Sequence, residues 1–374
     1  MSAFHNSYGK TFWTGILLYN KNILVKIRLM FLTESNIVGL KLISSLDLNN
    51  IKNEDVMYYD EGYYGSVSGI AGITDGATGF LSDIDSQGRI IQVPDITREK
   101  YSSARVWAEM LSQQLLKNAK NEKYDLIQVL KLSISEASER MPIVTDAVCS
   151  CQTPSAAVIL VRQCGDILEV IGSGDCCLIA EYHGGETLVV TGSAVLEKIR
   201  AVREAKILSE NPRFNEMSPE EKAKIRFFYM RQTRETLGNY SNGYFVPFYH
   251  GDKVMDDFCE KIFNNEFGKI NYLGKGDIWT LFIPSCRVKS LMLSSDGFID
   301  KVLKSQLADV QVLLEAGKTN AGLLELGKKL REHEMMFGKD VHARTMDMIQ
   351  NKRKYGSADD AVALYFEVGQ ADKG

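Results

Sequence analysis

The sequence predicts an α+β domain in which helices pack outside antiparallel sheets. Short apolar runs bounded by tight turns are typical of buried strands, and they follow one another here without the strand–helix alternation of a parallel sheet. Amphipathic stretches of helical period lie between these blocks. The chain has 374 residues, of which 45% are hydrophobic and 25% charged, so it can bury one large core or two smaller ones.

Glycine-rich turns separate the predicted strands of the first β region. These turns occupy residues 164–166 and 183–186, a pattern typical of β-hairpins. We therefore expect a meander of neighbouring antiparallel strands, and a final strand over Ala361 to Val368. The strands of the meander are Val67 to Ile73, Ala156 to Val161, Ile167 to Gly172, Cys176 to Tyr182 and Thr187 to Thr191.

Helices are expected where apolar residues recur at helical spacing. Two such stretches, Arg98 to Asn118 and Tyr124 to Ala137, each carry one apolar side that would cover a sheet. A third helix begins with a capping box at Ser218, has proline at its first position and ends near Gly238. The last helical region runs from Gln306 to Met336 and is broken around residues 317–320.

The predicted division of the chain is an N-terminal extension over 1–37 and a single domain over 38–370. Phe12 to Leu32 is apolar but is interrupted by three basic residues, and its longest uncharged piece, Thr11 to Asn20, is too short to span a bilayer. No small-residue cleavage site follows a basic start, which argues against a signal peptide. We expect a peripheral strand or a loosely attached extension there. The polar stretch from Arg203 predicts an insertion or flap around 203–245.

Charge and cysteine content narrow the class of protein. The formal net charge of −4, with scattered basic residues, predicts no nucleic-acid partner. The seven cysteines form no regular framework, and the five histidines lack zinc-site spacing. We expect a reducing, cytoplasmic setting without membrane association. Cys176 and Cys177 lie in an apolar run and should pack as small hydrophobes. The sequence does not predict an oligomeric state.

Three aspartates at the ends of apolar runs are the strongest chemical signal. They are Asp75, Asp296 and Asp359, and glycine directly follows the first two. A carboxylate at a strand end can point into a cleft while the strand holds its position. Several such carboxylates would repel one another unless a divalent cation lay between them, and oxygen-only ligand sets suit Mg²⁺ or Mn²⁺. The sequence therefore predicts an oxygen-ligated metal site built from distant segments.

Five acidic elements in a fixed order resemble the metal-dependent serine/threonine protein phosphatases of the PPM, or type 2C, family. A lone Asp-Gly pair is a common turn, but five elements in this order, each at a predicted strand boundary, are far more specific. Residues 231–245, which include Arg231 and end in Gly243 to Phe245, are similar to a bacterial subgroup. The five elements are Asn53 to Asp55, Asp75 to Gly79, Gly174 to Asp175, Ser295 to Gly297, and Asp359 with Asp360.

The resemblance implies a four-layer α/β/β/α sandwich with a two-metal centre at one edge. Asp75 would bridge two Mg²⁺ or Mn²⁺ ions, the carbonyl of Gly76 would bind one, and Asp296 and Asp359 would complete the other. Asp55, together with Glu54, would hold metal-bound water that attacks phosphorus in line. The implied protein is a signalling hydrolase, a phosphoric monoester hydrolase whose substrate is a phosphorylated protein.

Departures from the family pattern bear on catalysis. Family members usually have an arginine five residues before the third member of the Asn-Glu-Asp element, where this chain has Asn50. Lys52 could hold the substrate phosphate as a point charge, without a bidentate fork. Ser150 replaces the acid of a third metal site, and Asp146 is the nearest carboxylate. A shift of one residue would make Asp360, not Asp359, the ligand.

Two hypotheses follow from these observations. The first is a Mg²⁺- or Mn²⁺-dependent hydrolase of phosphoserine and phosphothreonine on proteins. The second is a catalytically weak type 2C-like module that binds a phosphoprotein or a regulator without turnover. The acidic motifs favour the first, whereas Asn50 and Ser150 keep the second open.

Overall fold

The computed structural model describes thirteen stretches of the chain in two separate units. The described residues are 3–5, 11–13, 40–48, 54–77, 82–84, 90–92, 103–140, 154–191, 193–237, 260–265, 268–273, 278–337 and 361–369. One unit comprises Met1–Val38 with Gly369–Gly374, and the other comprises Gly39–Val368. In the first unit, β1 (Ala3–His5) pairs antiparallel with β2 (Thr11–Trp13). The second unit contains all the elements discussed below.

A seven-stranded antiparallel sheet forms one half of the second unit. Its central strands are nearly continuous apolar runs, because both faces of the sheet are covered. Its strands, in spatial order, are β12 (Glu260–Asn265), β13 (Gly268–Leu273), β14 (Ile278–Pro284), β9 (Ile167–Ser173), β8 (Ser155–Cys164), β5 (Val67–Ala77) and β4 (Val56–Tyr64).

A five-stranded antiparallel sheet forms the other half. Neighbours in this sheet come from distant parts of the chain, so that the last strand of the unit lies beside the first. The spatial order is β11 (Thr187–Thr191), β10 (Cys177–Tyr182), β15 (Val288–Ser294), β16 (Ala361–Val368) and β3 (Leu40–Leu48). In a separate two-stranded sheet, β6 (Ser82–Ile84) pairs antiparallel with β7 (Ile90–Gln92).

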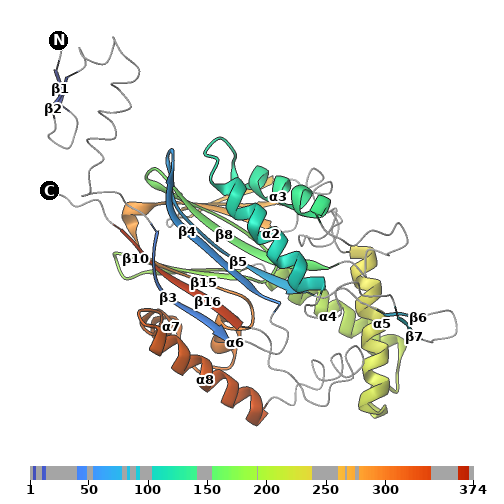
Figure 1. The fold of residues 1–374 in the computed structure, drawn as a ribbon. Coiled ribbons are helices and arrows are strands. Elements are labelled where there is room, and N and C mark those ends of the chain that lie inside the picture. Colours follow the sequence, from blue (N-terminus) through green and yellow to red (C-terminus); the bar gives the residue numbers. More distant parts are fainter. Residues whose placement is uncertain are drawn as a thin grey trace. The chain divides into compact units, whose positions relative to one another are not determined.

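Helices cover the outer face of each sheet, as Figure 1 shows. On the seven-stranded sheet, α2 (Ser103–Ala119) and α3 (Leu126–Arg140) bury Trp107 and Ile134 against Val158 of β8. On the five-stranded sheet, α6 (Ile299–Lys304), α7 (Val310–Gly317) and α8 (Asn320–Phe337) pack against a second apolar cluster.

The opposite faces of the strands form the layer between the sheets. In β8, Val158 belongs to the cluster under α2 and α3, whereas its neighbour Ile159 points to the other face and is also fully buried. In β15, Met292 belongs to the cluster under α7 and α8, and the adjacent Leu293 is equally buried. The predicted sandwich of two antiparallel sheets with helices outside is therefore confirmed.

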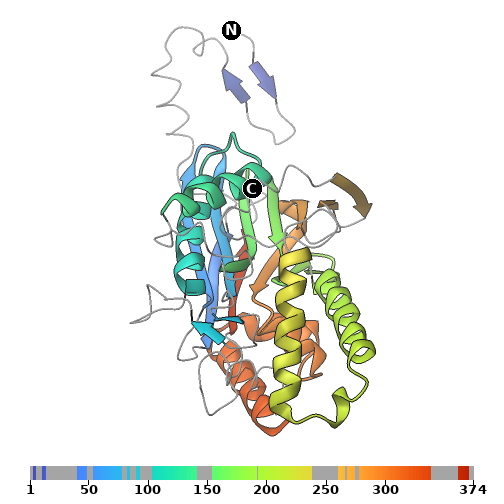
Figure 2. The same ribbon diagram turned by 90° about the vertical axis from the view of Figure 1, so that its right-hand side faces the viewer.

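A helical hairpin follows β11. It consists of α4 (Ser193–Glu210), a 3₁₀ turn, η3 (Phe214–Glu216), and α5 (Pro219–Leu237), and Figure 2 shows the two helices side by side. Its own small core contains Ile207, Phe214 and Tyr229. The predicted capping box begins α5, since the Ser218 amide donates to Glu221 Oε2 at 2.8 Å and the Glu221 amide donates to Ser218 Oγ at 3.3 Å.

The predicted meander is wrong at one point. The β8–β9 and β10–β11 hairpins form, but β9 belongs to the seven-stranded sheet and β10 to the five-stranded sheet. The chain changes sheets at Gly174, whose φ of +80° is readily adopted only by glycine. Apolar periodicity could not reveal this change, because a strand that continues a hairpin and a strand that joins the opposite sheet have the same pattern.

A second difference concerns the insertion that was expected from Arg203 onward. The first helix of the hairpin, α4, begins ten residues earlier, at Ser193.

No helix among the described residues is long and apolar enough to cross a membrane.

Candidate carboxylate site

The register of the seven-stranded sheet places two predicted site residues at one edge. Four residues on four neighbouring strands pair in register and form a line across the sheet. The residues adjacent to them on one side of this line therefore lie at the same end of the strands. Asp55 precedes the first of the four, Asp75 follows the second, and Gly174 follows the fourth. The four aligned residues are Val56, Thr74, Val158 and Ser173.

The five-stranded sheet brings two further segments to the same edge. Cys177 of β10 pairs with Ser294 of β15, which pairs with Ala363 of β16. At this end of the sheet, Cys176 directly precedes β10, and Ser295 and then Asp296 follow β15. Asp175 belongs to the short link that joins β9 to β10 and therefore connects the two edges.

Four carboxylates affect one buried thiol. Burial, and then the negative charges of Asp75, Asp175, Asp55 and Asp296, raise the pKa of the Cys176 thiol well above its ordinary value. Charge interactions of this kind weaken with distance. Four carboxylates, from three strand ends and the link between the sheets, therefore lie near the Cys176 thiol. We call Asp55, Asp75, Asp175 and Asp296 the carboxylate edge.

Gly76 fixes the spacing between β5 and the segment that precedes β4. A Cβ atom added at Gly76 would lie 2.6 Å from the carbonyl oxygen of Glu54 and 3.1 Å from that of Ala104. Backbone atoms cannot move aside as a flexible side chain does, so glycine is required for this close approach. The predicted residues Glu54 and Gly76 are therefore direct neighbours.

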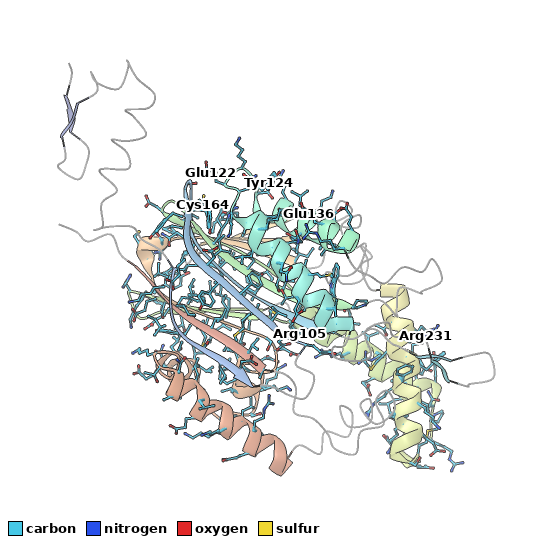
Figure 3. The ribbon with its side chains drawn as sticks, viewed as in Figure 1. Arg105, Glu122, Tyr124, Glu136, Cys164 and Arg231 are labelled. Carbon is cyan, nitrogen blue, oxygen red and sulfur yellow. The ribbon has the colours of Figure 1, made fainter. Side chains whose placement is uncertain are left out.

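Arg105 on α2 is hydrogen-bonded to the backbone of the carboxylate edge. Its guanidinium donates from Nη1 to the carbonyl oxygen of Asp55 and from Nε to Glu109 Oε1 at 2.7 Å. Figure 3 shows Arg105 near the N-terminal end of α2, away from Glu122 and Cys164 at the far end of the sheet. The Asp55 side chain beside it is almost completely buried, with 3% of the residue exposed. Arg105 thus helps to hold the backbone that presents Asp55.

A second arginine reaches the edge from the helical hairpin. Nη2 of Arg200 on α4 lies 3.3 Å from Oδ2 of Asp175. The Asp175 side chain is largely buried, whereas half of the Arg200 side chain is exposed. This ion pair connects α4 with the link between the two sheets.

The chemistry of the donor set fits a hard divalent cation. The described side chains at the edge offer carboxylate oxygens, the ligands that Mg²⁺ and Mn²⁺ prefer. No group of three or more His, Cys, Asp or Glu side chains that could hold a metal ion is found among the residues that the structure describes. Asp359, one of the predicted ligands, lies outside the described residues, as does the alternative Asp360.

Other predicted residues also lie outside the described part of the chain. These are Lys52, the family departures Asn50 and Ser150, and Asp146, together with residues 239–245 of the subgroup resemblance. The structure brings together Glu54, Asp55, Asp75, Gly76 and Asp296.

Sequence reasoning missed two contributors to this edge, Arg105 and Arg200. It correctly predicted that Cys176 is buried. The two arginines gave no local signal, because each belongs to an ordinary amphipathic helix and acquires its partner only through tertiary packing.

Comparisons with known proteins give likenesses of structure. No family model matches this sequence. No curated protein matches it either. The solved catalytic domain of the serine/threonine protein phosphatase PstP, in complex with two manganese ions, is 14% identical and has a TM-score of 0.41, with 89% of this chain and 100% of that chain covered.

Two further solved structures give similar values. Serine/threonine phosphatase Stp1 from Staphylococcus aureus is 11% identical, with a TM-score of 0.43 and coverage of 90% of this chain and 98% of that one. PppA, described as a key regulatory component of T6SS in Pseudomonas aeruginosa, is 11% identical, with a TM-score of 0.42 and coverage of 90% and 100%. Over about 90% of its length, the chain is therefore similar to solved structures that include serine/threonine phosphatases.

Proposed function

We propose that this protein hydrolyses phosphoserine and phosphothreonine on proteins in a reaction that depends on Mg²⁺ or Mn²⁺. The observation that carries the proposal is the carboxylate edge, where the strand register of both sheets brings acidic side chains to the same end of the strands, near one buried thiol. So much negative charge at one place is costly without a cation. The carboxylates come from strand ends and a short link between strands, which are rigid positions suited to metal ligands.

The proposed ligands are Asp75, Asp296 and Asp359, together with the carbonyl oxygen of Gly76. When bound, the two cations supply positive charge that activates water and stabilises the charge that develops on the phosphate oxygens. Asp55, supported by Glu54, accepts a hydrogen bond from the attacking water and orients it. This role is supported by the way Arg105 and Gly76 fix the backbone around Asp55.

The proposed reaction is a direct displacement by water. The water oxygen bonds to phosphorus, the bond from phosphorus to the serine or threonine oxygen breaks, and a proton from the water passes to that oxygen. The products are the free hydroxyl side chain and inorganic phosphate, and no covalent enzyme intermediate forms. Lys52 contributes a positive charge that holds the substrate phosphate.

A second candidate function is a phosphoprotein-binding module without turnover. It is favoured by the sequence, because Asn50 and Ser150 occupy the positions at which the type 2C family usually has a phosphate-binding arginine and the acid of a third metal site. In this alternative the fold and the edge persist, but a phosphorylated partner binds and is released unchanged.

Hydrolysis of p-nitrophenyl phosphate separates the two candidates. The full chain is assayed with Mn²⁺ and again with excess chelator, next to Asp75→Asn and a matched control, Asp166→Asn, in the β8–β9 turn at the other end of the sheet. The proposal expects chelator-sensitive turnover in the wild type and the control, and none in Asp75→Asn. Wild-type activity no higher than that of Asp75→Asn would favour the binding module.

A further inference from the structure

The helical hairpin of α4 and α5 contacts the carboxylate edge through Arg200. The hairpin has its own core, which contains Phe214 and Tyr229, and α4 packs most extensively against α5. Its ion pair to the edge is the contact between Arg200 and Asp175 at 3.3 Å. The hairpin therefore brings one positive charge to the place where the carboxylates gather.

Arg200 retains donors for a further acceptor. Among the described residues, Asp175 is the one hydrogen-bonding and ion-pair partner of Arg200, and it uses Nη2 alone. A guanidinium carries five N–H donors in a rigid fork. With 52% of the side chain exposed, a ligand in solution can reach Arg200. Arg105 differs, because Nε and Nη1 of its guanidinium already hold Glu109 and the Asp55 carbonyl.

A guanidinium at this place can bind a phosphate group directly. Carboxylates repel a phosphomonoester dianion, and Arg200 adds its positive charge to that of the proposed cations. Guanidinium groups bind phosphate through paired hydrogen bonds, which a lysine ammonium cannot do. Asp175 is largely buried and engages one nitrogen of Arg200, whereas half of the Arg200 side chain is exposed, so the pair can hold Arg200 in position while its other donors remain available to a phosphate.

We propose that Arg200 recognises the phosphate of the phosphoprotein substrate and that Asp175 positions it for this role. The helical hairpin is then a substrate-binding element beside the proposed reaction centre. The inference rests on the proposed function for the nature of the ligand, a phosphorylated serine or threonine. It adds to Lys52, the residue proposed above to hold the phosphate, a second cation that lies about 150 positions away in the sequence.

Peptide binding tests the inference without turnover. The probe is a fluorescein-labelled peptide in which a non-hydrolysable phosphonate replaces the phosphothreonine phosphate, and its threonine counterpart measures phosphate-independent binding. Fluorescence anisotropy is recorded with Mn²⁺ for wild type, Arg200→Ala and Arg200→Lys. Arg213→Ala is the matched control, because Arg213 lies on the same hairpin, is 83% exposed and pairs with Glu216.

We expect Arg200→Ala to weaken phosphonate-peptide binding by about tenfold or more, the loss typical of a charged hydrogen-bonding partner. Arg200→Lys should recover part of the loss, whereas Arg213→Ala should bind as wild type does. Binding of the threonine peptide should not change in any variant. An Arg200→Ala protein that binds the phosphonate peptide as tightly as Arg213→Ala would overturn the inference.

A double-mutant cycle tests the role of Asp175. If Asp175 acts through Arg200, Asp175→Asn weakens binding in the wild-type background but changes nothing in Arg200→Ala. If the effects of Asp175→Asn and Arg200→Ala on binding are additive, Asp175 does not act through Arg200.

Turnover separates this inference from the proposed function. Wild type that binds the phosphonate peptide through Arg200 but does not hydrolyse p-nitrophenyl phosphate would support Arg200 and refute the hydrolase. Wild type that hydrolyses it while Arg200→Ala keeps the wild-type peptide affinity and KM would refute the role of Arg200 alone. A wild type that does not distinguish the phosphonate from the threonine peptide would also overturn the inference.

Discussion

Replacing Arg162 by alanine should destabilise the protein far more than replacing an exposed arginine. Arg162 on β8 is 1% exposed, and its Nε lies 2.5 Å from Oε2 of its cross-strand partner Glu169. Its Nη1 donates to the carbonyl oxygens of Ala119 and Asn121 at 3.3 and 3.2 Å, and Nη2 donates to that of Tyr124. One side chain thus joins the β8–β9 hairpin to the connection between α2 and α3.

The expected loss follows from what the substitution leaves behind. Arg162→Ala leaves a largely buried carboxylate without its cation and removes the donor from three carbonyl groups. Removal of one partner from a buried ion pair costs about 3–5 kcal/mol. The exposed pair of Arg213 and Glu216 should contribute less than about 1 kcal/mol.

Urea unfolding followed by circular dichroism measures both values. Wild type, Arg162→Ala and Arg213→Ala are compared at one pH, and the free energy of unfolding is extrapolated to water. Arg162→Met, which keeps the volume but not the charge, shows how much of the loss is packing. Equal stability of Arg162→Ala and Arg213→Ala would refute the reasoning.

Three further outcomes are expected. Gly76→Ala should lose about 1–3 kcal/mol in urea unfolding, because the new methyl group meets the Glu54 carbonyl oxygen at 2.6 Å; wild-type stability would contradict the close approach. The hydrogen bond from Lys120 lowers the pKa of Asp60, so this pair stabilises the fold above the unfolded pKa of about 3.9 and ceases to do so as pH falls through the lower folded value. The urea midpoints of wild type and Asp60→Asn should therefore differ at pH 7 and converge at low pH, and a constant gap would argue against the ion pair. Ser218→Ala should reduce stability by about 1 kcal/mol through loss of the helix cap, measured by thermal melting, and an unchanged melting temperature would show that the cap is dispensable.

The sequence correctly predicted elements that depend on residues close together in the chain. The final strand was predicted over Ala361 to Val368, and β16 has those bounds, because every residue but one of this run is buried. The capping box at Ser218 was also confirmed, since it depends only on residues within one turn of helix. Trp107, in the stretch that was predicted to cover a sheet with its apolar side, is fully buried.

Features that depend on tertiary packing could not be predicted. The change of sheet at Gly174 needs knowledge of both sheets, and the pairing of Arg200 with Asp175 needs the position of a whole helical hairpin. Phe227 and Phe228 are adjacent on α5, and Phe227 is buried whereas more than half of Phe228 is exposed. A pair of adjacent aromatic residues on a helix cannot both face one core, and the sequence alone does not say which one does.

The position of β16 in its sheet has a consequence for protein synthesis. In the five-stranded sheet, β3 (Leu40–Leu48) pairs with β16 (Ala361–Val368). The first strand of this sheet therefore cannot pair until the last one has been translated. The seven-stranded sheet needs nothing beyond Pro284 and can assemble earlier. Pairing across so long a stretch is slow, because loop closure must precede the contacts that reward it. A nascent or truncated chain that ends before Ala361 therefore leaves β3 without its neighbour and β15 with one uncovered edge. Such an edge invites aggregation, so the emerging chain would depend on chaperones until its last strand is made.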